Sequence, residues 1–169
     1  ALDAIRNFSA ENVSYSHSAG LMELRKGLVE KYYKKIGIDL DVNELIVTIA
    51  GSESVNLSLE ITCNPGDEVL VLEPFYTNYN TFAFMNGITL KAIPTDIRNG
   101  FQVPPVEEFE KAITDRTKAI LVCNPGNPNG TLYSKESMLA LGEVAKKHDL
   151  FLISDEVYRE FCYTDEPHF

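Results

Sequence analysis

Cysteine is scarce in this sequence of 169 residues, which contains only Cys63, Cys123 and Cys162. The number is odd and no Cys-x-x-Cys pair occurs, so the sequence favours a reducing compartment and argues against a zinc site. A run of 18 apolar residues and a secretory signal peptide are also lacking. We therefore expect a cytoplasmic protein with no membrane partner.

Positively charged residues are also few. The chain has 15 Lys and Arg residues against 25 Asp and Glu residues, which gives a net charge of −10. Such a balance argues against a nucleic acid or an anionic membrane as a partner. No Gly-x-Gly-x-x-Gly motif is present, which weakens the case for a nicotinamide dinucleotide cofactor. The length and the 44% hydrophobic content fit one folded domain over residues 1–169.

Two apolar segments dominate the second half of the sequence. Residues 119–123 (Ala-Ile-Leu-Val-Cys) and 150–154 (Leu-Phe-Leu-Ile-Ser) each run directly into polar residues. Short continuous apolar runs separated by a helical pattern indicate neighbouring parallel strands that are covered on both faces. Ligands bind at the carboxyl ends of such strands, where Asn127, Asp155 and Tyr158 are expected to lie.

The remaining pattern alternates strands with helices. Further strands are predicted at residues 45–49, 69–72 and 89–93, and helices at residues 1–7, 21–37, 51–62, 77–85, 104–113 and 134–148. The alternation predicts an α/β fold with a mostly parallel sheet of about five strands and flanking helices.

Asp155 is the most informative single residue, because a carboxylate at the end of a buried strand needs a cation or several donors beside it. One interpretation is that Asp155 only caps the turn that follows. The other is that it faces a cationic ligand atom, such as a protonated pyridine nitrogen, while Asn127 and Tyr158 donate to a phenolate oxygen on the same ring. Pyridoxal phosphate has this combination, and its ring withdraws electrons only while the nitrogen is protonated.

A second candidate element is the turn at residues 50–53 (Ala-Gly-Ser-Glu), where the strand predicted at 45–49 meets a helix. The free N–H groups at the start of a helix can bind a phosphate. Many such turns bind nothing, so this turn by itself is weak support for a phosphate site.

Residues 127–130 (Asn-Pro-Asn-Gly) and 154–160 (Ser-Asp-Glu-Val-Tyr-Arg-Glu) resemble the core of a class I aminotransferase of the fold-type I family. The resemblance extends over essentially all 169 residues. The overall sequence is similar to bacterial aspartate aminotransferases. Asn129 is a departure, because the family usually has Thr there, but the ring-binding residue would be Asn127.

The resemblance implies a pyridoxal 5′-phosphate site and assigns a role to each of its residues. It implies that Asp155 faces the ring nitrogen, that Asn127 and Tyr158 bind the phenolate oxygen, and that Tyr76 stacks on the ring. The phosphate would be bound by Gly51, Ser52 and Glu53, with Glu53 acting through its backbone because its carboxylate would repel the anion. Tyr15 would reach the phosphate of the other subunit in a homodimer.

The resemblance also implies catalytic residues that this sequence does not contain. The Schiff-base lysine of the family follows the Asp-x-x-Tyr segment, whereas the last lysine here is Lys147. The arginine that binds the substrate carboxylate also lies in the family's C-terminal part. We therefore expect the chain to be an incomplete large domain, without its nucleophile.

Three functions compete on these grounds. The first is the cofactor-binding part of an aminotransferase that moves an amino group from an L-amino acid, aspartate or similar, to a 2-oxo acid. The second is another fold-type I enzyme, such as a carbon–sulfur lyase, which uses the same ring contacts. The third is a non-catalytic α/β binding module.

Overall fold

The computed structural model describes residues 1–9, 12, 14–163 and 168–169. The chain divides into two compact units, Ala1–Ile49 and Ala50–Phe169. None of the helices within the described ranges is both long and apolar enough to cross a membrane. The division of the chain into domains stays a prediction.

The first unit contains the short helix α1 (Leu2–Arg6) and one longer helical segment. The longer segment begins as α2 (Met22–Gly27), continues as a π-helical turn η1 (Leu28–Tyr32) and ends as a 3-10 turn η2 (Tyr33–Ile36). It stops at Gly37, whose φ of 81° is readily adopted only by glycine. The predicted helix that ends at Gly37 is therefore confirmed.

Arg25 is the buried anchor of this unit, with a relative exposure of only 3%. Its guanidinium donates to the carbonyl of Leu45 at 2.8 Å and also to the carbonyl of Val42, which lies in the 3-10 turn η3 (Val42–Glu44). A buried charge of this kind is tolerated because its donors are satisfied. Arg25 thus ties α2 to the segment that follows η3.

The strand predicted at residues 45–49 is wrong. Residues 45–48 have no regular secondary structure, and among the described residues no strand pairs with them. Instead, the N–H of Val47 donates to the carbonyl of Ala19 at 3.0 Å. Ile46 and Ile49 are 63% and 95% exposed. An apolar run becomes a strand only where a neighbouring strand pairs with it, which periodicity alone does not reveal.

Gly20 allows this loop contact. A Cβ atom at position 20 would lie 2.6 Å from Cβ of Val47, and the φ of 95° also disfavours any L side chain. The close approach of the two loop segments therefore requires glycine at this position.

The second unit is an α/β layer structure built around four strands. In chain order its elements are α3 (Gly51–Thr62), β1 (Glu68–Glu73), α4 (Asn78–Met85), β2 (Thr89–Pro94), η4 (Ile97–Asn99), α5 (Val106–Ala112), β3 (Thr117–Cys123), α6 (Lys135–Lys147) and β4 (Phe151–Asp155). All pairings are parallel and the strand order is β2-β1-β3-β4. The predicted fold class is confirmed, with four strands within the described ranges instead of about five.

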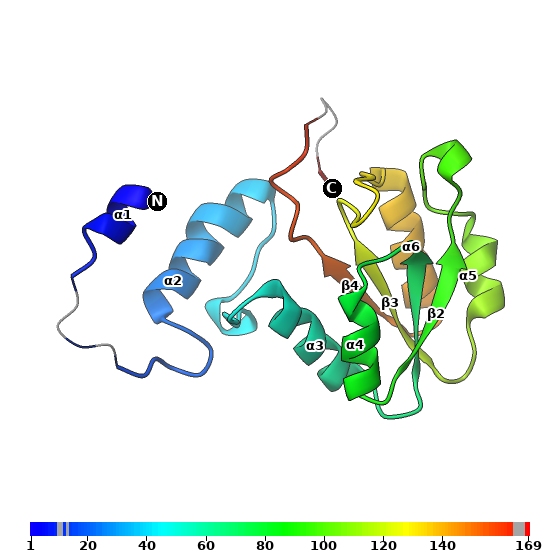
Figure 1. Ribbon diagram of the computed structural model, residues 1–169, viewed down its shortest axis with the longest axis horizontal. Coiled ribbons are helices and arrows are strands. Elements are labelled where there is room, and N and C mark those ends of the chain that lie inside the picture. Colours follow the sequence, from blue (N-terminus) through cyan, green and yellow to red (C-terminus); the bar gives the residue numbers. More distant parts are fainter. Residues whose placement is uncertain (10–11, 13, 164–167) are drawn as a thin grey trace. The chain divides into compact units, whose positions relative to one another are not determined.

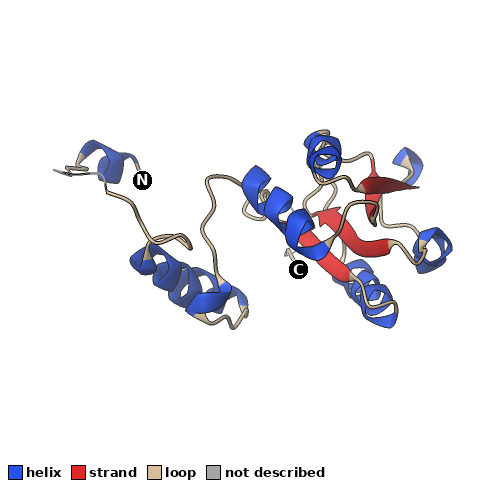
Figure 2. Cartoon of the chain, turned by 90° about the horizontal axis from the view of Figure 1, so that it is seen from below, coloured by secondary structure: helices blue, strands red, loops and turns tan. Residues whose placement is uncertain are grey.

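Helices cover both faces of this sheet, as Figures 1 and 2 show. Alternate residues of β1 point to opposite faces, so Leu70 and Leu72 pack with α5 and α6, whereas Val69 and Val71 pack with α3 and α4. The four central residues of β1 are at most 5% exposed. Burial on both faces explains why the two central strands, β1 and β3, contain continuous apolar runs rather than alternating ones.

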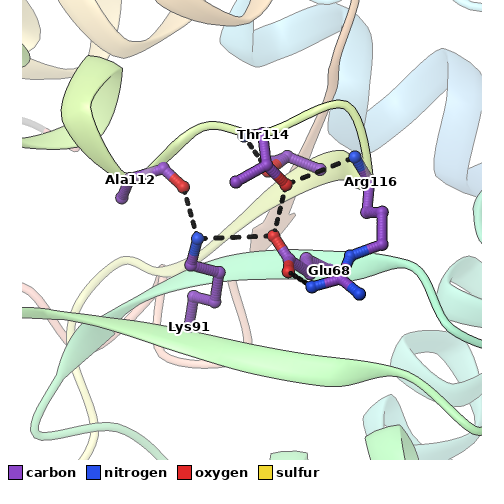
Figure 3. A network of polar contacts seen from close by, with 6 residues as sticks. Glu68, Lys91, Ala112, Thr114 and Arg116 are labelled. Atoms are coloured by element: carbon purple, nitrogen blue, oxygen red, sulfur yellow. Dashed lines mark hydrogen bonds and ion pairs between the residues drawn. The ribbon is translucent and has the colours of Figure 1, made fainter.

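A charged network closes the amino end of the sheet (Figure 3). The Glu68 carboxylate accepts hydrogen bonds from the Thr114 hydroxyl at 2.7 Å and from the Arg116 guanidinium at 2.6 Å, and Nζ of Lys91 lies 3.4 Å away. Lys91 also donates to the carbonyl of Ala112 at 2.7 Å. The network joins β1, β2 and the loop between α5 and β3. The hydrogen bond from Thr114, helped by Arg116 and Lys91, lowers the pKa of Glu68 to about 2.

Glu68→Gln should lower the free energy of unfolding by about 1.5–3 kcal/mol, the range for hydrogen bonds to charged groups. Because the folded-state pKa of Glu68 is depressed, its contribution is complete above the ordinary pKa near 4.5 and is lost as the pH falls towards about 2. Urea denaturation at several pH values tests both statements. The two proteins should differ at pH 6 and converge near pH 2.

Glu108→Gln is the matched control, because Glu108 pairs with Lys111 on an exposed helix surface. Exposed ion pairs contribute little to stability. The free energy of unfolding of this variant should therefore lie within about 0.5 kcal/mol of that of the unmodified protein. Equal losses in the two variants would show that the Glu68 network has no special role.

Candidate functional site

The carboxyl ends of β1, β3 and β4 open into a cavity of about 270 Å³. This volume is near the lower end of the range for small-molecule sites, which begins at roughly 300 Å³. The cavity lies entirely within the second unit. Most of the predicted site residues line it: Gly51, Ser52, Tyr76, Asn127, Asp155 and Tyr158.

Strand pairing places Asp155 at this cavity. The parallel register of β3 and β4 aligns Cys123 with Asp155, and the N–H of Asn124 donates to the Asp155 carbonyl at 3.0 Å. The last residues of both strands therefore reach the same edge of the sheet, and the loops that follow bring Asn127 and Tyr158 to the same cavity.

Among the described residues of this unit, the carboxylate of Asp155 has two donors. The Tyr79 hydroxyl donates to Oδ2 at 2.6 Å, and the backbone N–H of Val157 donates to Oδ1 at 3.2 Å. The second contact is the capping bond that the simpler interpretation of Asp155 predicts. The first comes from α4 and places the carboxylate beside the cavity. Asp155 thus serves the local turn and also presents a negative charge to the cavity.

Asn127 and Tyr158 form the polar pair of the cavity. Nδ2 of Asn127 lies 3.3 Å from the Tyr158 hydroxyl oxygen, to which it donates. The Asn127 amide and the Tyr158 hydroxyl can both donate hydrogen bonds. Because they lie this close together, both can bind a single oxygen atom of a ligand.

The loop that carries Asn127 is held by its own backbone and by Asn129. Oδ1 of Asn129 accepts from the N–H of Thr131 at 3.1 Å, and the N–H of Gly126 donates to the Thr131 carbonyl at 2.8 Å. A Cβ atom on residue 126 would lie 2.3 Å from Oδ1 of Asn129, so glycine at this position allows the Asn129 side chain to approach closely. Asn129, at a position where the family usually has Thr, therefore stabilises this turn.

The amino end of α3 forms another wall. The helix begins at Gly51 after the extended residue Ala50, and no side chain caps it. The first N–H groups of a helix lack partners within the helix and carry partial positive charge, which suits an anion. Gly51 and Ser52 line the cavity. Glu53 is exposed, does not line the cavity, and its N–H donates to the Ala50 carbonyl at 3.0 Å.

Tyr76 supplies an aromatic side chain on the cavity wall. Its ring packs edge-on against Tyr79 with centroids 5.6 Å apart, and Nδ2 of Asn78 donates to its hydroxyl at 2.7 Å. These contacts orient a flat surface suited to stacking on a planar ligand.

Tyr15 is the predicted site residue that belongs to the first unit. It is fully exposed and is not among the residues that line the cavity. Its predicted role across a dimer interface stays a prediction.

Sequence reasoning missed Tyr79 and Cys123. Tyr79 is 1% exposed and binds Asp155, and Cys123 lines the cavity. The available signal was the three-residue spacing from Tyr76 to Tyr79, which spans the turn that leads into α4, where the N–H of Tyr79 donates to the Tyr76 carbonyl at 3.0 Å. Burial, together with the charge of Asp155, raises the pKa of the Cys123 thiol.

A family model described as aminotransferase class I and II matches residues 4–169. The chain belongs to this family. The aspartate/prephenate aminotransferase of Thermus thermophilus is 37% identical over 163 residues, which are 96% of this chain and 42% of that protein. The aspartate aminotransferase of Bacillus subtilis is 30% identical over 98% of this chain and 42% of its own length. The chain thus spans about two fifths of the length of these curated relatives.

Solved structures agree with the aminotransferase assignment. The structure of Thermus thermophilus aspartate aminotransferase with maleate matches 92% of this chain and 41% of its own, with a TM-score of 0.87 and 37% identity. Alanine aminotransferase from Pyrococcus furiosus matches 99% of this chain and 42% of its own, with a TM-score of 0.89 and 35% identity. Aminotransferases of this family depend on pyridoxal phosphate, so the cavity is to be compared with that cofactor.

Alkylation of the cysteines tests the electrostatics of the cavity. The thiolate is the reacting form, so the raised pKa should make Cys123 slow towards iodoacetamide near pH 8. Asp155→Asn removes a negative charge that contributes to this shift and should accelerate the reaction of Cys123 by a factor on the order of a few. Peptide mass spectrometry over time measures the rate.

Cys63 is the internal control for this experiment, because burial and then the charge of Asp67 raise its pKa. Its alkylation rate should be the same with Asp155 or Asn at position 155. An unchanged rate at Cys123 would show that the Asp155 charge does not act on that thiol.

Proposed function

We propose that this chain forms the cofactor-binding part of an aminotransferase, which transfers an amino group from an L-amino acid to a 2-oxo acid with pyridoxal 5′-phosphate. The observation that carries the proposal is one cavity that combines a carboxylate, a convergent polar pair, an aromatic wall and an uncapped helix start. Each of these four features suits a different part of the cofactor.

The donor set of the cavity fits the cofactor part by part. Asp155 suits a protonated ring nitrogen, and the Asn127–Tyr158 pair suits the phenolate oxygen on the same ring. Tyr76 suits the ring face. When bound, the cofactor supplies an electron sink for the bonds of the substrate's amino-bearing carbon.

The phosphate of the cofactor would be bound at the start of α3. The N–H groups of Gly51 and Ser52 and the helix dipole favour an anion there. Glu53 was predicted to assist through its backbone, and its position outside the cavity favours Gly51 and Ser52 as the main contacts.

Asp155 determines the chemistry that the bound ring can perform. A negative charge in partly buried surroundings favours a proton on a facing nitrogen, because the ion pair stabilises both charges. The donors from Tyr79 and Val157 keep this carboxylate oriented before any ligand arrives. Asn127 and Tyr158 would hold the ring at its other edge.

For the substrate we propose aspartate or a similar amino acid, with a 2-oxo acid as acceptor. Aspartate appears in the names of several relatives at 30–37% identity. Other relatives are named for alanine or aromatic amino acids. For the assembly we propose a cytoplasmic homodimer with Tyr15 contributing to the site of the other subunit.

Asp155→Asn separates the catalytic interpretation from simple capping. In the complete enzyme this variant should fold and bind cofactor, because asparagine keeps the shape and the capping acceptor. It should lose a factor on the order of 10² in proton abstraction from the substrate, about 3 kcal/mol of barrier. Single-turnover absorbance measurements with the substrate give this rate.

Asp149→Asn is the matched control, since it makes the same chemical change at an exposed residue before β4. Asp149 has a φ of 54°, a conformation that asparagine also adopts readily. Its rate should equal that of the unmodified enzyme. A rate for Asp155→Asn within about threefold, roughly 0.7 kcal/mol, would leave Asp155 only its capping role.

The homodimer proposal has its own test. The complete enzyme should be a dimer by light scattering at the assay concentration, and Tyr15→Phe should weaken cofactor binding by about three- to tenfold, as expected for one lost hydrogen bond. Tyr163→Phe, at a residue that is also largely exposed, should bind cofactor normally. A fully active monomer would contradict the shared site.

A further inference from the structure

A buried hydroxyl group from α4 contacts the candidate site from the protein core. Tyr79 is only 1% exposed, and its hydroxyl oxygen lies 2.6 Å from Oδ2 of Asp155. The other oxygen, Oδ1, accepts from the N–H of Val157 at 3.2 Å. A carboxylate can accept about four hydrogen bonds, so two fixed donors still leave it able to bind a cationic ligand atom.

The ring of Tyr79 is held on two sides by aromatic neighbours. Phe75 stacks on it with centroids 6.3 Å apart and planes 12° apart, and Tyr76 meets it edge-on at 5.6 Å. Tyr79 also belongs to the core cluster between the sheet and the helices α3 and α4. Its hydroxyl is therefore directed at Asp155 by packing.

This hydroxyl stays a donor at every pH at which enzymes work. Burial, and then the hydrogen bond to Asp155, raise the pKa of Tyr79 far above its usual range. Between Tyr79 and Asp155 the proton therefore remains on the phenol oxygen, which donates to the carboxylate.

We propose that Tyr79 is a positioning residue for Asp155, whose carboxylate it fixes at the cavity in the orientation that keeps a proton on the facing ring nitrogen of the cofactor. The proposal rests on the proposed function, because it presumes that the cavity holds a pyridinium ring.

The physical reason is the orientation of one negative charge. A carboxylate that directly faces a nitrogen atom favours the protonated form of that nitrogen. Without the Tyr79 hydroxyl, Oδ2 of Asp155 loses its donor from α4, and the carboxylate is free to turn away from the ring nitrogen. The weaker ion pair then favours the neutral ring, which is the poorer electron sink.

Tyr79→Phe tests the proposal, because it removes one oxygen atom and keeps the ring. In the complete enzyme loaded with cofactor that carries ¹⁵N at the ring nitrogen, the NMR resonance should move towards the position of unprotonated nitrogen. Proton abstraction in a single turnover should slow by about tenfold, as expected for one hydrogen bond to a charged group.

Tyr133→Phe is the matched control. Tyr133 is 4% exposed and belongs to the core cluster on the other face of the sheet. Loss of its hydroxyl should leave the nitrogen resonance and the single-turnover rate unchanged. If Tyr79 had a purely structural role, Tyr79→Phe would lower the stability of the protein and leave the ring-nitrogen resonance unmoved. That result would overturn the proposal.

A double-mutant cycle shows whether Tyr79 acts through Asp155. The Asp155→Asn enzyme has no carboxylate for Tyr79 to position. Adding Tyr79→Phe to it should therefore change the rate of proton abstraction by less than about twofold. A full tenfold loss in that background would show that Tyr79 acts by another route, and would overturn the proposal.

A second variant covers the case in which Tyr79→Phe does not fold. Tyr79→3-fluorotyrosine keeps the ring and the hydroxyl donor, so the resonance should stay at the position of protonated nitrogen; movement towards the unprotonated position would overturn the proposal. Failure of the unmodified enzyme to take up cofactor would instead contradict the proposed function itself. Uptake with an unmoved resonance in Tyr79→Phe contradicts only the role of Tyr79.

Discussion

The site depends on a carboxylate that ends a parallel strand, because a negative charge at that position requires donors from elsewhere in the fold. Asp155 obtains one donor from its own turn, through the N–H of Val157, and one from α4, through Tyr79. The two donors lie on segments separated by more than seventy residues. A parallel α/β sheet brings such segments together, because the loops that follow its strands gather at one edge.

The two ends of the sheet show two ways of accommodating charge. At the amino end, Glu68 is neutralised by Arg116 and Lys91, so its charge is satisfied within the protein. At the carboxyl end, the described contacts of the Asp155 carboxylate are with neutral groups, a phenol and a backbone amide. A carboxylate held by neutral donors keeps its negative charge available to a cationic ligand, which distinguishes a binding site from a structural ion pair.

Packing against the sheet links the core to the site. Tyr79 belongs to the cluster formed by Val69, Val71 and the helices α3 and α4, and it also contacts Asp155. A change in the packing of α4 would therefore alter the position of the carboxylate as well as the stability of the sheet. Tyr76, in the turn just before α4, lines the cavity and packs edge-on against the ring of Tyr79.

The sequence alone determined the elements whose signals are local. Continuous apolar runs indicated β3 and β4, and the alternating pattern of the chain indicated β1 and β2. The spacing of leucines and the glycine at 37 indicated the helix that ends there, and the motifs around Asn127 and Asp155 indicated the family. The prediction failed at residues 45–49, because a strand requires a partner that no local pattern contains. Only the tertiary structure decided that Tyr79 meets Asp155 and that Glu53 stays outside the cavity. Such contacts depend on the register of β3 with β4 and on the docking of α4, and these are set by packing between distant segments.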